Sequence, residues 1–249
     1  MTFSAIISAD RLTNFFEPLS ALVDECKLYL GVGGLKVRAV DPANVGMIDT
    51  ELDASGFESY EADGDLIGLN LNQFEDVLGL ADSSDLIHLE LNEQIRKLDI
   101  RFGEVDYTQA LINPETIREE PDIPSLDSPV TLTATGKQMD RGATAADLVD
   151  DHIELRSDGE RPAFIIDAEG DTDDVQVTYD RDDLIDAKIP ESVRSLFSLD
   201  YMTDMVGVMD ADAEVRVQLD DEMPVKMSYE HSEGHASVTY FLSPRVASE

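Results

Sequence analysis

Apolar and polar residues alternate along most of this chain in short runs, a pattern typical of half-buried β-strands. In the first part of the chain, strands are predicted at residues 3–7, 26–30, 35–40 and 45–52. Between the first two, residues 10–23 place apolar side chains at helical spacing, although Pro18 falls inside the stretch and is expected to kink or shorten the helix. The glycines at 31, 33 and 34 predict a hairpin.

The same order of elements returns three more times. Asn72 is expected to cap a helix over residues 72–80, and two later helices are predicted at residues 138–149 and 199–208. Strands at residues 86–91, 95–102 and 105–111 complete the second unit. Each of the four units therefore reads as a strand, a helix and three strands. Two amphipathic helices and many strands per half predict an α+β fold, with the helices packed on antiparallel sheets.

Short sequence patterns recur at an offset of about 128 residues. Residues 22–28 return as 148–154, and residues 69–74 return as 197–202. Between the halves, Pro114, Pro121, Pro124 and Pro129 exclude a regular helix or ladder. We therefore predict two similar domains, at residues 1–114 and 129–249, joined by an extended connector at residues 115–128.

The charge of the chain is extreme: 54 acidic against 18 basic residues, for a formal net charge of -36. Because 42% of the residues are apolar, a folded protein with an acidic surface is expected rather than a disordered chain. Salt near 1 M shortens the Debye length to about 3 Å and screens such repulsion. The composition thus indicates adaptation to a very salty cytoplasm; mimicry of nucleic acid is disfavoured because the acids are spread along the whole chain.

Cys26 is the only cysteine, so no internal disulfide can form. Neither a charged-then-apolar leader nor an apolar run of about 20 residues is visible, which predicts a cytoplasmic protein without a membrane span.

Catalytic and cofactor motifs are weak. Asp171, Asp173 and Asp174 could hold a hard cation, but the run lacks the glycine and glutamate of a calcium loop. His231 and His235 lack a third zinc ligand at a suitable spacing. We therefore expect no cofactor, no metal and no enzymatic activity.

Three stretches, read in order along the duplicated chain, carry a family resemblance: LKVRAVDPANV at 35–45, EPDIP at 120–124 and LFSLDYM at 196–202. Two more, MPVKMSY at 223–229 and YFLSPR at 240–245, complete it. The chain resembles the DNA sliding clamps of archaea and eukaryotes, the proliferating cell nuclear antigen family. The resemblance implies a DNA polymerase processivity factor: a homotrimeric ring that encircles duplex DNA, with helices around the hole and sheets outside.

By the same resemblance, DNA polymerase, a clamp loader, flap nuclease and ligase bind through short peptides to a pocket under the connector. The implied pocket residues are Val40, Asn44, Val45, Met47, Ile123, Pro124, Leu126, Pro224, Phe241, Leu242, Ser243 and Pro244. The plausible phosphate contacts are Arg11, Lys137, Arg141 and Arg194, fewer cations than the family usually places on the helices. Edges for joining subunits are expected at residues 107–112 and 175–179, each of which could also be an interior strand.

Two alternatives stay open at this point. One is a metal-dependent hydrolase built on Asp171, Asp173 and Asp174, and the other is a monomeric scaffold with the same fold.

Overall fold

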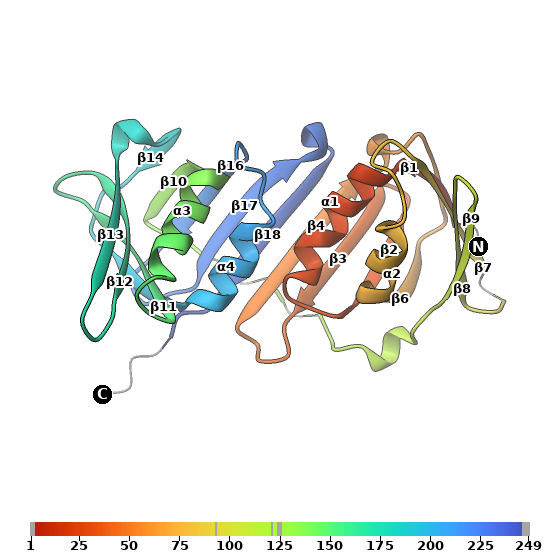
Figure 1. The fold of residues 1–249 in the computed structure, drawn as a ribbon, viewed down its shortest axis with the longest axis horizontal. Coiled ribbons are helices and arrows are strands. Elements are labelled where there is room, and N and C mark those ends of the chain that lie inside the picture. The colour runs from red at the N-terminus through yellow and green to blue at the C-terminus, as the bar shows by residue number, and fades with distance from the viewer. Residues whose placement is uncertain (1–2, 93, 121, 124–125, 246–249) are drawn as a thin grey trace. The chain divides into compact units, whose positions relative to one another are not determined.

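The computed structural model describes residues 3–92, 94–120, 122–123 and 126–245 (Figure 1). The chain forms two compact units. The first consists of Met1–Pro42, Ile48–Pro121 and Glu230–Val238, and the second of Ala43–Met47, Asp122–Tyr229 and Thr239–Glu249. Both units place helices on antiparallel sheets, which confirms the α+β class.

The first unit contains two layers of strands and two helices. One sheet has the order β5-β1-β7-β8-β9, and the other layer has the order β4-β3-β2-β6. The strands are β1 (Phe3–Ser8), β2 (Glu25–Gly31), β3 (Gly34–Val40), β4 (Gly46–Asp53), β5 (Ser59–Ala62), β6 (Asp65–Asn70), β7 (Leu86–Asn92), β8 (Lys97–Phe102) and β9 (Val105–Ala110). The helices are α1 (Ala9–Ser20), α2 (Leu71–Leu78) and the 3-10 turns η1 (Ala54–Gly56) and η2 (Pro114–Thr116).

The second unit repeats this plan. One sheet has the order β13-β12-β11-β15, and the strands of its other layer have the order β14-β10-β16-β17-β18. The strands are β10 (Val130–Thr135), β11 (His152–Asp158), β12 (Ala163–Glu169), β13 (Asp174–Asp180), β14 (Asp186–Lys188), β15 (Arg194–Ser198), β16 (Glu214–Leu219), β17 (Val225–His231) and β18 (Ala236–Leu242). The helices are α3 (Gly136–Ala146), α4 (Leu199–Gly207) and the turns η3 (Arg181–Asp183) and η4 (Ser232–Gly234).

Each helix buries the apolar face that its spacing predicted. In the first unit, Phe16 of α1 and Phe74 of α2 meet edge to face, with ring centroids 4.7 Å apart. Aromatic pairs in this geometry add about 0.5–1.5 kcal/mol beyond the area they bury. In the second unit Gly142 lets α3 approach β12, because a Cβ there would lie 2.2 Å from Ile166 Cδ1. The two helices of each unit thus pack as one layer on a sheet.

Several helix boundaries differ from the sequence prediction. Helix α3 runs over Gly136–Ala146 rather than over residues 138–149. Asn70, not Asn72, caps α2: its Oδ1 accepts a hydrogen bond of 2.9 Å from the backbone N–H of Gln73. In α1 the helix ends at Ser20 rather than at residue 23, and buried Pro18 lies inside its last turn. Pro18 has no N–H to donate to the carbonyl oxygen four residues earlier, and the helix ends at Ser20, shortly after it.

Strands β5 and β14 were not predicted. The expected pattern of one strand before each helix is therefore wrong for α2 and α4, each of which follows two strands. Each is only three or four residues long. β5 pairs with β1, the first strand of the first compact unit, and β14 pairs with β10, the first strand of the second. By contrast, the expected subunit edges fall on β9 and β13, and both strands terminate their sheets.

Candidate functional site

Most of the pocket residues implied by the resemblance come from three segments of the second unit. The backbone N–H of Ser243 donates to the carbonyl oxygen of Val45 over 2.9 Å, which ties the segment after β18 to the segment before β4. Asn44, the residue before Val45, has a φ of 59°, a left-handed conformation that Asn tolerates better than most residues. A connector segment, residues 122–123 and 126–129, contributes Ile123 and Leu126.

Exposure separates these residues into surface and core. Ile123 is open to solvent, with 43% of its surface exposed, whereas Leu242 is fully buried and packs in the core. Phe241 lies on the opposite face of β18 from Leu242 and is 5% exposed. Met47 is also buried; Val45, Leu126, Pro224, Ser243 and Pro244 are partly exposed, and Asn44 is exposed. Val40, partly exposed, lies in the first unit, and Pro124 lies outside the described residues.

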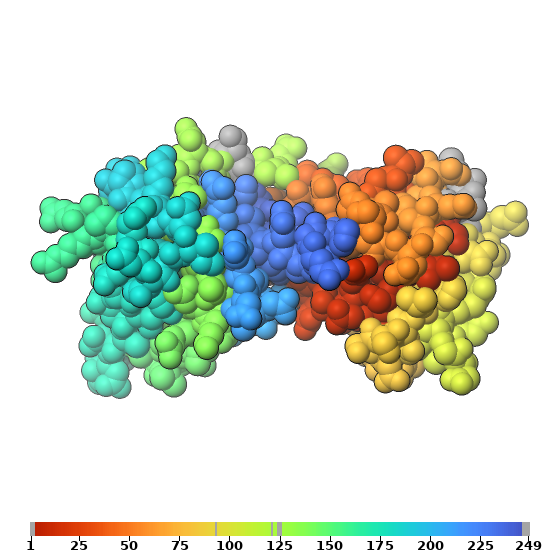
Figure 2. Space-filling view, turned by 90° about the horizontal axis from the view of Figure 1, so that it is seen from above, coloured from red at the N-terminus to blue at the C-terminus, as the bar shows by residue number. Residues whose placement is uncertain are grey.

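Arg11, a proposed phosphate contact, makes two contacts to protein groups. Its Nη1 donates to the carbonyl oxygen of Gly56 over 3.1 Å, and its Nη2 pairs with Glu233 Oε2 over 2.7 Å. Glu233 belongs to the tip of the β17–β18 hairpin, seen in dark blue beside the red N-terminal residues in Figure 2. The same tip accepts a 2.8 Å hydrogen bond from the Asp53 N–H at the His235 carbonyl. Arg11 therefore fastens the hairpin tip within the first unit.

Replacing Arg11 should consequently affect stability. We expect Arg11→Gln to lower the free energy of unfolding by about 1 kcal/mol, the usual net value of a lost hydrogen-bonded contact, and the Tm by about 2–4 °C. Thermal unfolding at a fixed molar KCl concentration measures this. The control is Arg141→Gln, at an exposed position of α3. Equal Tm values for the two variants would contradict the role assigned to Arg11.

The other three cations have different settings. Lys137 and Arg141 are exposed, four residues apart on α3, and so share one helix face. Arg194 lies in β15, directly opposite Arg156 of β11, and not on a helix. Of these four residues, only Lys137 and Arg141 are therefore exposed cations on a helix.

Acids occupy the helices in greater number. Burial raises the pKa of the Glu75 carboxyl on α2, even though the Ser20 hydroxyl donates to its Oε1 over 2.5 Å, and Glu17 and Asp76 raise this pKa further. Burial, and then the charge of Asp200, raise the pKa of Asp204 on α4. Like charges are thus crowded on both helix pairs.

Because the pKa of Glu75 is raised, we expect its contribution to the free energy of unfolding to depend on pH. Its stabilising contribution is complete below the unfolded value, near 4.5, and is lost as pH rises through the folded value. At neutral pH the ionised group opposes folding, so Glu75→Gln should raise the free energy of unfolding by about 0.5 kcal/mol after screening is allowed for. Urea unfolding curves should show this gain at pH 7 and none below pH 4.5. Asp140→Asn, which removes an exposed charge from α3, is the control; a gain that does not depend on pH would contradict the assignment.

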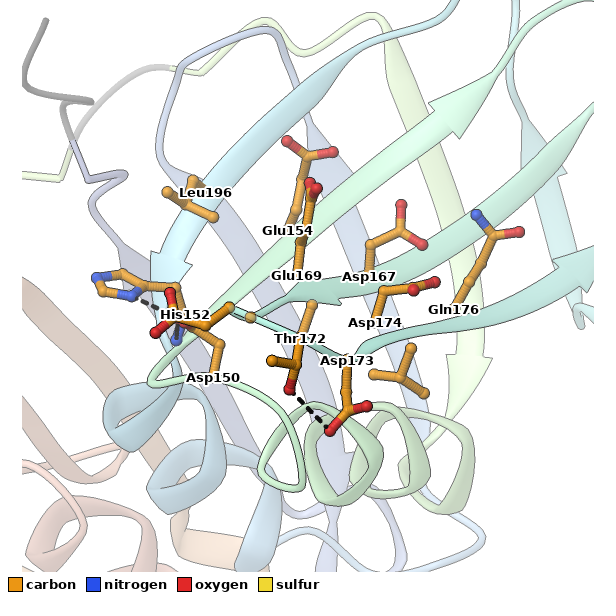
Figure 3. Close-up of a pocket in the computed structure, with 14 residues that line it drawn as sticks. Asp150, His152, Glu154, Asp167, Glu169, Thr172, Asp173, Asp174, Gln176 and Leu196 are labelled. Carbon is orange, nitrogen blue, oxygen red and sulfur yellow. Dashed lines mark hydrogen bonds and ion pairs between the residues drawn. The ribbon is translucent and has the colours of Figure 1, made fainter.

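An acidic pocket of about 800 Å³ lies on the four-stranded sheet of the second unit (Figure 3). Its wall includes the three aspartates of the hydrolase alternative, Asp171, Asp173 and Asp174. The Thr172 hydroxyl donates to Asp173 Oδ2 over 3.3 Å, and His152 Nδ1 lies 2.8 Å from Asp150 Oδ1. Across the described ranges, no three His, Cys, Asp or Glu side chains are close enough together to hold a metal ion. The pocket therefore lends the hydrolase alternative no support.

Neither Cys26 nor the histidines His231 and His235 belong to a metal-holding group among the described residues. Cys26 is buried in β2, and burial raises its thiol pKa, which disfavours the reactive thiolate. His231 ends β17, and His235 Nδ1 lies 3.1 Å from the Ser55 hydroxyl oxygen. Every helix in the described part of the chain is too short or too polar to cross a membrane.

The duplicated units, four helices on antiparallel sheets and a terminal strand at each outer sheet define the class of DNA clamp folds. The family model "Proliferating cell nuclear antigen, N-terminal domain" matches residues 4–112. The DNA polymerase sliding clamp of Haloarcula marismortui is 53% identical over 99% of this chain and 100% of its own length. That of Halobacterium salinarum is 50% identical over 99% of both chains.

Among solved structures, A. fulgidus PCNA with the C-terminal region of FEN-1 bound superposes with a TM-score of 0.93. It is 33% identical and covers 99% of this chain and 100% of its own. The chain belongs to the proliferating cell nuclear antigen family of DNA polymerase sliding clamps. A sliding clamp is a processivity factor and not an enzyme, so the hydrolase alternative is set aside. The similarity of this chain to clamps of halophilic archaea is consistent with the salt adaptation expected from its charge.

Proposed function

We propose that three copies of this chain close into a ring around duplex DNA and tether replication and repair enzymes to it. The observation that carries the proposal is that β9 in the first unit and β13 in the second each form an edge of their sheet. Joining β9 of one copy to β13 of the next would remove both edges, and repetition of one heterologous contact closes a ring. Under this proposal the monomeric scaffold is excluded.

The two edges suit pairing with one another. In β9, Val105 and Tyr107 alternate with polar residues, and in β13, Val175, Val177 and Tyr179 alternate with polar residues. Neither strand contains a lysine or an arginine, so the contact would depend on backbone hydrogen bonds and apolar side chains. Light scattering in molar KCl tests this. A mass of three 27.4 kDa chains supports the ring, whereas the mass of a single chain contradicts it.

We assign partner binding to the segments around Val45, Ile123 and Phe241, with the other residues implied by the resemblance. The bound FEN-1 segment belongs to the A. fulgidus protein; by the family relationship, we propose that a flap nuclease, DNA polymerase, ligase and the clamp loader use the same surface here. Exposed Ile123 supports this, because an aliphatic side chain that is already open to solvent offers a peptide an apolar contact.

Enclosure, rather than attraction, would hold the DNA. On the helices the phosphate contacts reduce to Lys137 and Arg141, with Arg11 engaged by Glu233 and Arg194 on a strand. The logarithm of the affinity for DNA falls linearly with the logarithm of the salt concentration, with a slope of about -0.9 for each phosphate contact. Added lysines would therefore contribute little in molar salt. We place this activity in the cytoplasm and divide the chain at 1–114, 115–128 and 129–249.

A further inference from the structure

One sheet face of the second unit carries basic residues in a chain that is otherwise acidic. Strand register aligns Lys188 of β14, Thr131 of β10, Gln218 of β16 and Lys226 of β17 in a single row. Arg216 lies two residues from Gln218 and therefore on the same side of the sheet. The alternate residues Val217, Leu219 and Met227 are fully buried, so this row faces away from the core. We call Lys188, Arg216, Gln218 and Lys226 the outer basic face.

The charge of this face departs from that of the chain. Acids outnumber bases three to one overall, 54 to 18, yet three bases stand here beside one acid, Asp186. Acids return on the same side only at the far ends of β16 and β17, as Glu214 and Glu230. No carboxylate of the described residues forms an ion pair with Lys188, Arg216 or Lys226. The outer basic face therefore keeps its positive charge.

The corresponding layer of the first unit behaves differently. There Arg38 Nε lies 3.2 Å from Asp49 Oδ1, and Lys36 pairs with Glu51 on the adjacent strand. The same architecture thus neutralises its cations in one unit and leaves them available in the other. Lys36 and Arg38 provide a matched control for the outer basic face.

Lys226 also connects this face to the proposed peptide site. Its Nζ lies 5.6 Å from the centre of the Phe241 ring, within the range of a cation–π contact. Phe241 points to the same side of β18 as Lys226 does on β17. The ammonium group of Lys226 therefore lies at the margin of the apolar site, where a bound peptide would not need to displace it.

We propose that the outer basic face binds an acidic stretch of the partner polypeptide, next to the apolar residues that enter the peptide site. This inference rests on the proposed peptide site and adds the chemistry of the partner to it. Lys226 and Arg216 are specificity-determining residues: they favour partners whose apolar motif is flanked by Asp or Glu. An extended peptide is narrow enough to contact both cations while avoiding Glu214 and Glu230, whereas a duplex would bring its phosphates close to those acids.

The experiment measures fluorescence anisotropy with three synthetic peptides. One is the C-terminal peptide of the cognate flap nuclease; the other two add four Glu or four Gln residues, tested at either end. At about 0.5 M KCl we expect the Glu-extended peptide, at one of the ends, to bind about fivefold more tightly than its Gln counterpart. The difference should shrink toward about 3 M KCl, because contacts between exposed charges are screened.

The double variant Lys226→Gln with Arg216→Gln should remove this preference, so that the Glu-extended and Gln-extended peptides bind it with equal affinity. Lys36→Gln with Arg38→Gln should retain the preference. Equal binding of Glu and Gln peptides by the native protein, or a preference that survives in the first variant, overturns the proposal. Preferential binding of a DNA duplex, lost in the first variant, would overturn it in favour of nucleic acid. If even the unextended peptide fails to bind, the peptide site itself is wrong and this inference falls with it.

Discussion

Transfer from about 3 M to about 0.1 M KCl should dissociate the ring into single chains. At the lower concentration the Debye length grows from under 3 Å to about 10 Å, so the acids of neighbouring copies repel one another. The proposed contact brings Asp106 of β9 near Asp174 or Asp180 of β13. Neither strand contains a basic residue, and the cation next to Asp106 is Arg101 of β8, whose Nε lies 3.9 Å from Asp106 Oδ1. Sedimentation at a series of KCl concentrations measures the transition.

Neutralising acids at the edges should shift that transition. Asp106→Asn with Asp174→Asn is expected to keep the assembly intact at severalfold lower salt, because fewer like charges meet across the contact. The control replaces Glu58 and Glu61 by Gln, at and beside β5, the opposite edge of the sheet that ends in β9. A trimer that remains intact in dilute buffer, or an equal shift in the control, would contradict both the edges and the charge argument.

Truncating two apolar side chains of the peptide site should abolish most partner binding. The double variant Ile123→Ala with Phe241→Ala is expected to lower the affinity for the flap-nuclease peptide about 100-fold, or by about 2.7 kcal/mol, because two apolar contacts are lost. Ile123 is 43% exposed, so its loss leaves the fold unaffected. Isothermal titration in molar KCl measures the affinity, and light scattering shows whether the assembly persists.

Phe241 requires a milder substitution beside it, because removing a ring that is only 5% exposed costs about 3–5 kcal/mol of stability. Phe241→Leu with Ile123→Ala keeps apolar volume in the sheet and should still weaken binding at least tenfold. The control is Leu80→Ala, which truncates a side chain 69% exposed in the first unit. Unchanged affinity in both double variants would remove the site from this surface.

Local patterns predicted the elements that depend on local physics. Alternation found most strands, and helical spacing found all four helices, because a buried face imposes its period on the sequence. Strands β5 and β14 escaped since each is short and is held mainly by its neighbours. The edge positions of β9 and β13 could not be derived from alternation, because an edge is a property of pairing.

Side-chain partners far apart in sequence were beyond prediction. Arg11 was expected to contact phosphate from its place on a helix, but its partner Glu233 is 222 positions away. The role of Lys226 could not be predicted from the sequence, because it depends on the pairing register of β16 and β17 and on the nearby ring of Phe241. The family resemblance named the peptide site, yet it could not separate buried Leu242 from exposed Ile123.

We propose that a closed ring of three copies retains DNA by surrounding it. The direct test incubates labelled protein with linear duplex, blocks both DNA ends with bulky proteins, and washes with KCl at a concentration that keeps the assembly intact. We predict that the protein stays on the blocked duplex and leaves when a restriction cut frees an end. Release at the same rate from blocked and open DNA would contradict the account.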